Sequence, residues 1–350
     1  MSDYRIFISY SHRDSDLVKA LCDHIAHHLK MIPVSYENIR GYGEGVSEHI
    51  KLYIRHAHVF MPVITRATNS QWVHEEIGYA TALNVPVIPI AVGALPKAMI
   101  QNVKAIPLPN REESIRLMIT EDIINDAVET KDHSNSALFY CADLPEDRAI
   151  MMSGYAEDVA RLGYVGKVRQ QGGLSSFHIP SQILEDPRWR LRYGKQQRSE
   201  YHCRLQRNER LTLSKHADRA GARILISPDL DYAEYGPEAR VVRLESLIDF
   251  LNESRDNIEI GRIPAKDIGQ SITIVGDWFF SQSILGTYDH GYRQTIFTCH
   301  AATIQRKILA FDEAFAHAEA AWPWPGDGSS RKRAIAYLDG MVADLKRKMV

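Results

Sequence analysis

The chain has 350 residues, a length that favours two domains over one. It is 45% hydrophobic and 25% charged, which excludes wholesale disorder, and its formal net charge of −2 gives no overall attraction to nucleic acid or anionic lipid. The four cysteines form no CxxC pair, which argues against a zinc site and a dense disulfide framework. A polar N-terminus and the lack of about 20 consecutive apolar residues predict a cytoplasmic protein without a membrane span.

Short apolar runs alternate with amphipathic stretches of helical length in the first third of the chain. The predicted strands are residues 4–10, 32–36, 58–65, 85–92 and 105–108, and the predicted helices are residues 16–29, 46–56, 70–83 and 112–127. This alternation is typical of a parallel sheet covered by helices. We therefore expect an α/β domain over residues 1–127.

The polar segment 128–136 is predicted to be a linker, because the apolar pattern restarts after it. The predicted strands of the next region are residues 137–142, 222–228 and 270–280, and its predicted helices are residues 149–162, 211–220, 239–251 and 301–321. We expect a second α/β domain over residues 137–321. A break rich in Trp and Pro then precedes a C-terminal helix, so residues 322–350 are predicted to be a helical extension.

Two adjacent glutamates lie on the predicted helix SQWVHEEIGYATAL, residues 70–83. With about 100° per residue, Glu76 falls within the apolar arc, between Leu83 and Ala80, whereas Glu75 falls outside it. An unpaired carboxylate on an apolar face costs on the order of several kcal/mol unless it is protonated, paired or lines a cavity. Spacing alone leaves two interpretations of Glu76, a structural residue that caps the helix or pairs with a basic group, and a functional carboxylate.

Four segments of the first domain occur in the order found in the Toll/interleukin-1 receptor (TIR) domain. They are IFISYSHRD, RGYGEGV, VFMPVIT and SQWVHEEIGYA. Residues 1–125 therefore resemble a TIR domain. The resemblance implies a flavodoxin-like parallel sheet with its functional surface at the carboxyl ends of the strands.

One branch of the TIR family signals by TIR–TIR contact, and another cleaves NAD+ with a glutamate four residues after a tryptophan. That position is Glu76, four residues after Trp72. The resemblance thus implies that Glu76 is the catalytic residue of an NAD+ nucleosidase. NAD+ would be the substrate, and we expect neither a cofactor nor a metal site. Water attack would give ADP-ribose, and attack by the adenine would give a cyclic isomer.

The residues that follow the first predicted strand are candidates for substrate binding. Family resemblance places nucleotide contacts at Tyr10, Ser11 and Arg13, although the enzymes often carry an arginine earlier in this segment. The alternative is a surface loop in which Asp14 or Ser15 caps the next helix.

Three further candidates are Tyr42, Gly43 and Trp72. The GxGxG pattern around Gly43 lacks the spacing of a dinucleotide fingerprint and resembles the mobile loop that TIR domains use in self-association. Tyr42 is placed to stack on nicotinamide or adenine, with an exposed loop tyrosine as the alternative. Trp72 is interpreted as a cleft wall rather than a core residue.

The second domain has weaker signals. Residues 270–277 resemble a degenerate phospholipase-D-like motif, with Asp277 in the aspartate position and Gln270 and Ile272 replacing the histidine and lysine. The basic stretch Arg188–Arg210 carries interleaved aromatics and is either a nucleic-acid-binding patch or a solvated helix packed on an acidic neighbour.

The resemblance to NAD+-cleaving TIR domains implies a bacterial immune effector that cleaves NAD+ once it self-assembles through its TIR domain. The second domain would receive an unknown activating ligand or partner. The alternatives are a non-enzymatic TIR scaffold and a nucleic-acid-binding regulator that acts through Arg188–Arg210.

Overall fold

The computed structural model divides into two compact units, which are described separately. One unit comprises Met1–Leu138 with Cys299–Thr303, and the other comprises Phe139–Thr298 with Ile304–Val350. The structure describes residues 4–36, 44–66, 71–97, 100–109, 112–130, 140–142, 145–161, 163, 165–172, 208–209, 211–229, 236–253, 257–268, 270–285 and 292–349. No helix within these ranges has the length and apolar character to cross a membrane.

The first unit is built on a five-stranded sheet with the strand order β2-β1-β3-β4-β5. The strands are β1 (Arg5–Ser9), β2 (Ile32–Val34), β3 (Val59–Thr65), β4 (Ile90–Val92) and β5 (Ile106–Pro107). All four strand pairings are parallel. This order is that of the flavodoxin-like fold, so the predicted fold class is confirmed.

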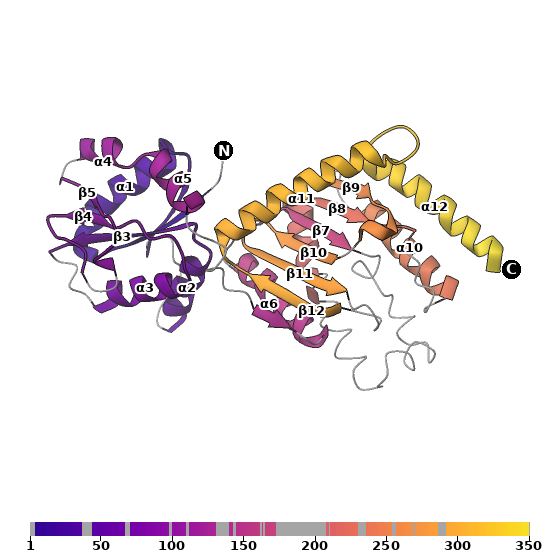
Figure 1. Cartoon of the computed structure of the whole chain (residues 1–350), viewed down its shortest axis with the longest axis horizontal. Coiled ribbons are helices and arrows are strands. Elements are labelled where there is room, and N and C mark those ends of the chain that lie inside the picture. The colour runs from indigo at the N-terminus through magenta and orange to yellow at the C-terminus, as the bar shows by residue number, and fades with distance from the viewer. Residues whose placement is uncertain are drawn as a thin grey trace. The chain divides into compact units, whose positions relative to one another are not determined.

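Helices cover both faces of this sheet (Figure 1). One face carries α1 (Ser15–His27), α4 (Glu112–Met118) and α5 (Glu121–Thr130), and the other carries α2 (Glu44–Arg55) and α3 (Gln71–Ala82). Side chains alternate along β1, so Ile6 and Ile8 join the core under α1. Phe7 points the opposite way and joins the core under α3.

Two predicted elements of the first unit differ from the structure. The helix predicted at residues 112–127 is two helices, α4 and α5, separated by Ile119 and Thr120. The carbonyl oxygen of Ile119, which this break leaves available, lies 2.8 Å from His24 Nε2. The strand predicted at 85–92 is only β4, preceded by an isolated bridge at Val87, because the flanking Pro86 and Pro89 have no N–H group. The predicted linker 128–136 begins inside α5, and its residues 131–136 lie outside the described ranges.

The second unit contains a seven-stranded mixed sheet with the order β6-β12-β11-β10-β7-β8-β9. The strands are β6 (Tyr140–Ala142), β7 (Val168–Gly172), β8 (Ala222–Ile226), β9 (Ile258–Arg262), β10 (Gln270–Val275), β11 (Phe279–Leu285) and β12 (Tyr292–Thr298). Strands β7, β8 and β9 are parallel, and the remaining pairings are antiparallel. Sequence analysis did not detect β7 or β9.

The prediction of a single strand at residues 270–280 was wrong, because β10 and β11 form a hairpin. Gly276 begins the turn with a φ of +51°, a conformation that favours glycine. A Cβ atom there would lie 2.9 Å from the Cα atom of Gly166, so two backbone segments approach closely at this point. Asp277, the aspartate of the phospholipase-D-like resemblance, therefore lies in a turn.

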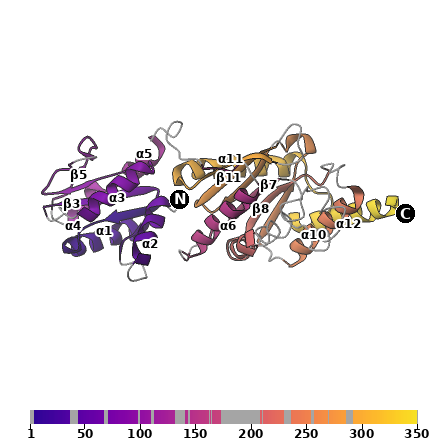
Figure 2. The ribbon, with the colours of Figure 1, turned by 90° about the horizontal axis from the view of Figure 1, so that it is seen from below.

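Helices α6 (Pro145–Arg161) and α11 (Ala301–Ala321) lie on opposite sides of the second sheet (Figures 1 and 2). The adjacent residues Phe279 and Phe280 point to opposite faces, as strand periodicity requires. The ring of Phe279 stacks with Tyr155 of α6, whereas Phe280 belongs to the core that includes Phe311 and Phe315 of α11.

The C-terminal residues form part of the second unit, in which they cover the edge strand β9. The Trp324 indole donates a hydrogen bond of 2.8 Å to the carbonyl oxygen of Ile260, and the Arg262 guanidinium lies over the rings of Trp324 and Tyr337. Helix α12 (Ser330–Met349) follows. Residues 322–349 thus form hydrogen bonds with β9 and cover a sheet edge that would otherwise be exposed.

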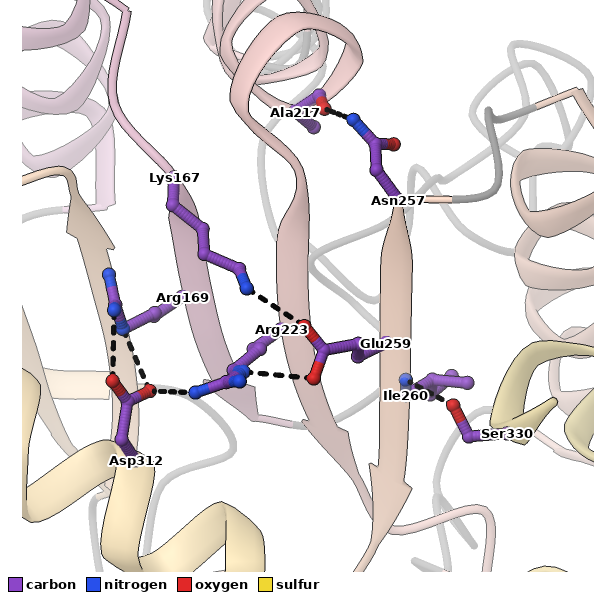
Figure 3. Close-up of polar contacts among 9 residues, drawn as sticks. All are labelled: Lys167, Arg169, Ala217, Arg223, Asn257, Glu259, Ile260, Asp312 and Ser330. Carbon is purple, nitrogen blue, oxygen red and sulfur yellow. Dashed lines mark hydrogen bonds and ion pairs between the residues drawn. The ribbon is translucent and has the colours of Figure 1, made fainter.

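Five charged side chains link α11 to the parallel strands of the second unit (Figure 3). Asp312 of α11 accepts two hydrogen bonds of 2.9 Å from Arg169 and pairs with Arg223 at 3.0 Å. Glu259 pairs with Arg223 at 3.0 Å and with Lys167 at 2.8 Å. Because Arg169, Arg223 and Glu259 are side by side in the strand register, neighbouring strands share the network.

Candidate active site

Helix α3 presents one glutamate to the interior of the first unit and the other to solvent. Glu76 is only 5% exposed and lies beside the buried side chains of Val73 and Ile77, whereas Glu75 is exposed. The burial that helical periodicity predicts for Glu76 is therefore confirmed. Its position in the middle of α3 does not correspond to that of a residue that caps the helix start.

The Glu76 carboxylate accepts two short hydrogen bonds on the same oxygen. The Ser9 hydroxyl donates to Oε2 at 2.6 Å, and the Tyr36 hydroxyl donates to the same atom, also at 2.6 Å. Ser9 is the last residue of β1, and Tyr36 follows β2 by two residues. Oxygen–oxygen distances of about 2.5–2.7 Å are those of hydroxyl groups that donate to an ionised carboxylate.

The other carboxylate oxygen, Oε1, is buried and has no hydrogen-bond partner of normal geometry. No ion pair joins Glu76 to a lysine or arginine in the described part of the chain. The structural interpretation, in which Glu76 pairs with a basic residue, therefore has no support among these residues.

Burial raises the pKa of the Glu76 carboxyl, and the hydrogen bonds from Ser9 and Tyr36, together with the nearby Trp72 indole, oppose part of that rise. Burial and the adjacent Glu76 carboxylate also raise the pKa of the Tyr36 phenol. Tyr36 therefore keeps its proton at neutral pH and remains a hydrogen-bond donor.

Aromatic side chains surround the ring of Tyr36. Its centroid lies 5.0 Å from that of Tyr10, 6.2 Å from that of Phe7 in an edge-on arrangement, and 6.1 Å from that of His12. These contacts limit the movement of the phenol, since offset and edge-on aromatic pairs attract each other. The hydroxyl that meets Glu76 is thus held by packing as well as by its hydrogen bond.

The predicted substrate-binding residues are in several environments. Tyr10 is 4% exposed and belongs to the core under α1, so it has little surface for a substrate. Ser11 is half-buried and Arg13 is exposed, in the short 3-10 helix His12–Asp14. Asp14 is the N-cap residue of α1, but its side chain makes no cap hydrogen bond and instead accepts one from Thr65 at 3.0 Å.

Trp72, at 43% exposed, is not a core residue. It lies one helical turn before Glu76 and is close enough for its indole to lower the pKa of that carboxyl. Tyr42 and Gly43 lie outside the described residues, as does the basic stretch Arg188–Arg210 apart from residues 208–209.

Sequence analysis missed both hydroxyl donors to Glu76. The sequence could have indicated Ser9 and Tyr36 as site residues, since each lies at or near the carboxyl end of a predicted strand. Strand periodicity also places Ser9 on the same face as Phe7, the face that α3 covers.

The three polar residues meet where open parallel sheets usually bind ligands. In the order 2-1-3-4-5, the direction of winding changes between β1 and β3, and ligands bind beside the carboxyl ends of the strands at that point. Ser9 ends β1, and Glu76 is on the helix that follows β3. The fold and these residues define a doubly wound α/β domain with a buried carboxylate at the edge where folds of this class usually bind ligands.

Residues 6–119 match the family model of the TIR domain. The N-terminal unit of this chain is therefore a TIR domain, as the sequence segments predict. No curated protein matches the chain. Among solved structures, the chain is similar to TrmBL2, described as an archaeal chromatin protein with a novel mode of DNA binding, at 8% identity over 57% of this chain and 59% of that chain. The TM-score is 0.30, and a likeness this weak carries no conclusion about fold or function.

Proposed function

We propose that this protein cleaves NAD+ at the bond between nicotinamide and ribose, with Glu76 as the catalytic carboxylate. The observation that carries the proposal is a carboxylate that is 5% exposed, has one oxygen without a partner and lies at the ligand-binding edge of a TIR domain. Strongly perturbed, desolvated carboxylates occur preferentially at functional sites.

The reaction requires one negative group near the ribose. When the C1′–N bond breaks, its electron pair leaves with nicotinamide, which departs as a neutral molecule and needs no general acid. Positive charge develops on the ribose ring, as in glycoside hydrolysis. A carboxylate held in a site of low dielectric stabilises that charge, and no basic residue of the described chain neutralises Glu76 beforehand. Water then adds to C1′ and loses a proton, which gives ADP-ribose, or the adenine adds and gives a cyclic isomer.

The wider role belongs to the same proposal. TIR domains self-associate, and we propose that self-association completes the site and that the second unit receives the activating ligand. Such a protein suits bacterial immunity, in which NAD+ depletion or a cyclic nucleotide product follows activation.

Nicotinamide release tests the proposed activity. The full-length protein at high concentration is incubated with NAD+ beside Glu76→Gln and Glu76→Ala, with Glu75→Gln as the matched control on the same helical turn. We expect kcat to fall by about 10²–10³-fold in both Glu76 variants, the effect of losing one preorganised electrostatic group, and to stay unchanged in Glu75→Gln.

Two outcomes would contradict the proposal. Cleavage that survives in Glu76→Ala would remove Glu76 from the mechanism. A wild-type protein that assembles through its TIR domain and releases no nicotinamide would instead support a TIR scaffold.

A further inference from the structure

Two hydroxyl groups donate hydrogen bonds to the Glu76 carboxylate. Ser9 and Tyr36 each have a single hydroxyl proton, and both hydroxyl oxygens lie 2.6 Å from Oε2. Their own oxygens are 3.5 Å apart, so each proton is best used on Oε2. With both hydroxyl groups donating, Oε2 accepts two hydrogen bonds from the protein.

We propose that Ser9 and Tyr36 are positioning residues that hold the Glu76 carboxylate through their hydrogen bonds to Oε2. This inference rests on the proposed function and adds to it the two residues that orient the catalytic group.

The other carboxylate oxygen shows why these two hydrogen bonds matter. A buried acceptor without a partner is costly, and more so if it is charged. Oε1 of Glu76 is such an atom, since it is shielded from solvent and has no hydrogen-bond partner. The two hydrogen bonds to Oε2 are therefore the contacts that offset the cost of burying the carboxylate.

The tyrosine is suited to this role at neutral pH. The packing of Tyr36 against Tyr10 and Phe7 fixes its ring, and the raised pKa of its phenol keeps the donated proton in place. Ser9 is fully buried at the end of β1, so its hydroxyl has little freedom to turn elsewhere. A side chain that is held by packing positions a catalytic group more accurately than one on a loose loop.

The first test measures the carboxyl itself in the full-length protein, without reference to activity. Glutamate carrying ¹³C at the carboxyl is incorporated, and the resonance of Glu76 is assigned by its loss in Glu76→Gln. Ser9→Ala and Tyr36→Phe should each raise the pKa of Glu76, because each removes a donor to the ionised form. Ser9→Thr, which keeps a hydroxyl, should leave it near the wild-type value. A pKa that neither Ser9→Ala nor Tyr36→Phe changes would overturn the inference.

The second test uses kinetics with NAD+. Ser9→Ala and Tyr36→Phe should lower kcat by between about tenfold and a hundredfold with little change in KM, because the carboxylate is misplaced rather than absent. The acidic limb of the pH profile should move to higher pH in both, and Ser9→Thr should restore it. A loss of kcat with an unmoved acidic limb indicates a merely structural role and contradicts the inference.

The two tests together separate the inference from the proposed function. If the wild-type protein cleaves no NAD+ but Ser9→Ala and Tyr36→Phe raise the pKa of Glu76, the proposed function fails and the assignment of the two positioning residues stands. If NAD+ is cleaved and neither variant changes that pKa, the proposed function stands and the inference fails.

Discussion

A buried or partly buried carboxylate has different partners and an opposite pKa shift in the two units of this protein. In the TIR unit, Glu76 meets two hydroxyl groups and no basic residue of the described chain, and burial raises its pKa. In the second unit, Asp312 meets the guanidinium groups of Arg169 and Arg223. Burial also acts on Asp312, but hydrogen bonds from these two arginines hold its pKa below the ordinary value.

The contrast shows that the partner, rather than burial alone, decides the effect of a carboxylate on folding. Burial still matters, since Glu209 of the second unit is more buried than Asp312 and has a raised pKa although one guanidinium, that of Arg148, lies 3.5 Å away. One guanidinium does not offset the desolvation of the more buried Glu209, whereas two offset that of the partly exposed Asp312. The charge of Asp312 stabilises its unit, and the charge of Glu76 is maintained at a cost to stability. The proposed catalytic role of Glu76 would account for a charge that is kept at this cost.

The largest effect on stability should come from Asp312→Ala. This change leaves Arg169 and Arg223 without their shared carboxylate and removes the ion pairs that link α11 to the strands (Figure 3). Breaking a fully buried pair costs about 3–5 kcal/mol, and partial exposure should reduce the loss here to about 2 kcal/mol. Urea denaturation measures it, with the exposed Asp327→Ala as the control.

The loss in Asp312→Ala should depend on pH. The folded-state pKa of Asp312 is lowered, so its contribution is present above the unfolded pKa of about 3.9 and disappears as pH falls through the folded value. A difference between wild type and variant that grows on acidification would contradict the ion-pair explanation.

Glu76→Gln should stabilise the protein, the opposite of Asp312→Ala, and by a smaller amount. The folded-state pKa of Glu76 is raised, so the wild type loses stability as pH rises through that value. The glutamine does not ionise, and the variant should be more stable by on the order of 1 kcal/mol in the alkaline range, a few degrees in Tm. The gain should vanish below the unfolded pKa of about 4.3.

Thermal unfolding of Glu76→Gln, measured from pH 4 to pH 9, checks that expectation. The control is Glu75→Gln on the exposed side of α3, which should leave Tm unchanged throughout. If Glu76→Gln destabilises the protein most at high pH, the charge of Glu76 is stabilised by a group outside the described residues.

The smallest effect is expected for Lys346→Ala. The ammonium of Lys346 lies 2.7 Å from Glu245, but both side chains are substantially exposed to solvent. Exposed ion pairs contribute about 0–1 kcal/mol and are screened by salt. The variant should lose less than about 0.5 kcal/mol in urea denaturation at physiological salt. A loss as large as that of Asp312→Ala would show that exposure does not separate the two kinds of pair.

Sequence reasoning succeeded where a structural feature depends on neighbouring residues. The strands β1 and β3 and the helices α1, α3 and α11 follow from local apolar patterns. The strands β7 and β9 were missed because each mixes few apolar residues with charged ones, such as Arg169 in β7 and Glu259 in β9. Those charges are tolerated within a covered sheet because they pair across the strands, which no local pattern reveals.

For the candidate site, the sequence by itself determined that Glu76 turns inward and Glu75 outward, because the period of a helix is a local property. Only the tertiary structure decided what Glu76 meets inside. Its two donors lie 67 and 40 residues away in the sequence, Ser9 at the end of β1 and Tyr36 just after β2. They converge because the strand order places β1 beside β2 while α3 covers the same face. That convergence fixes one oxygen of the carboxylate and leaves the other without a partner.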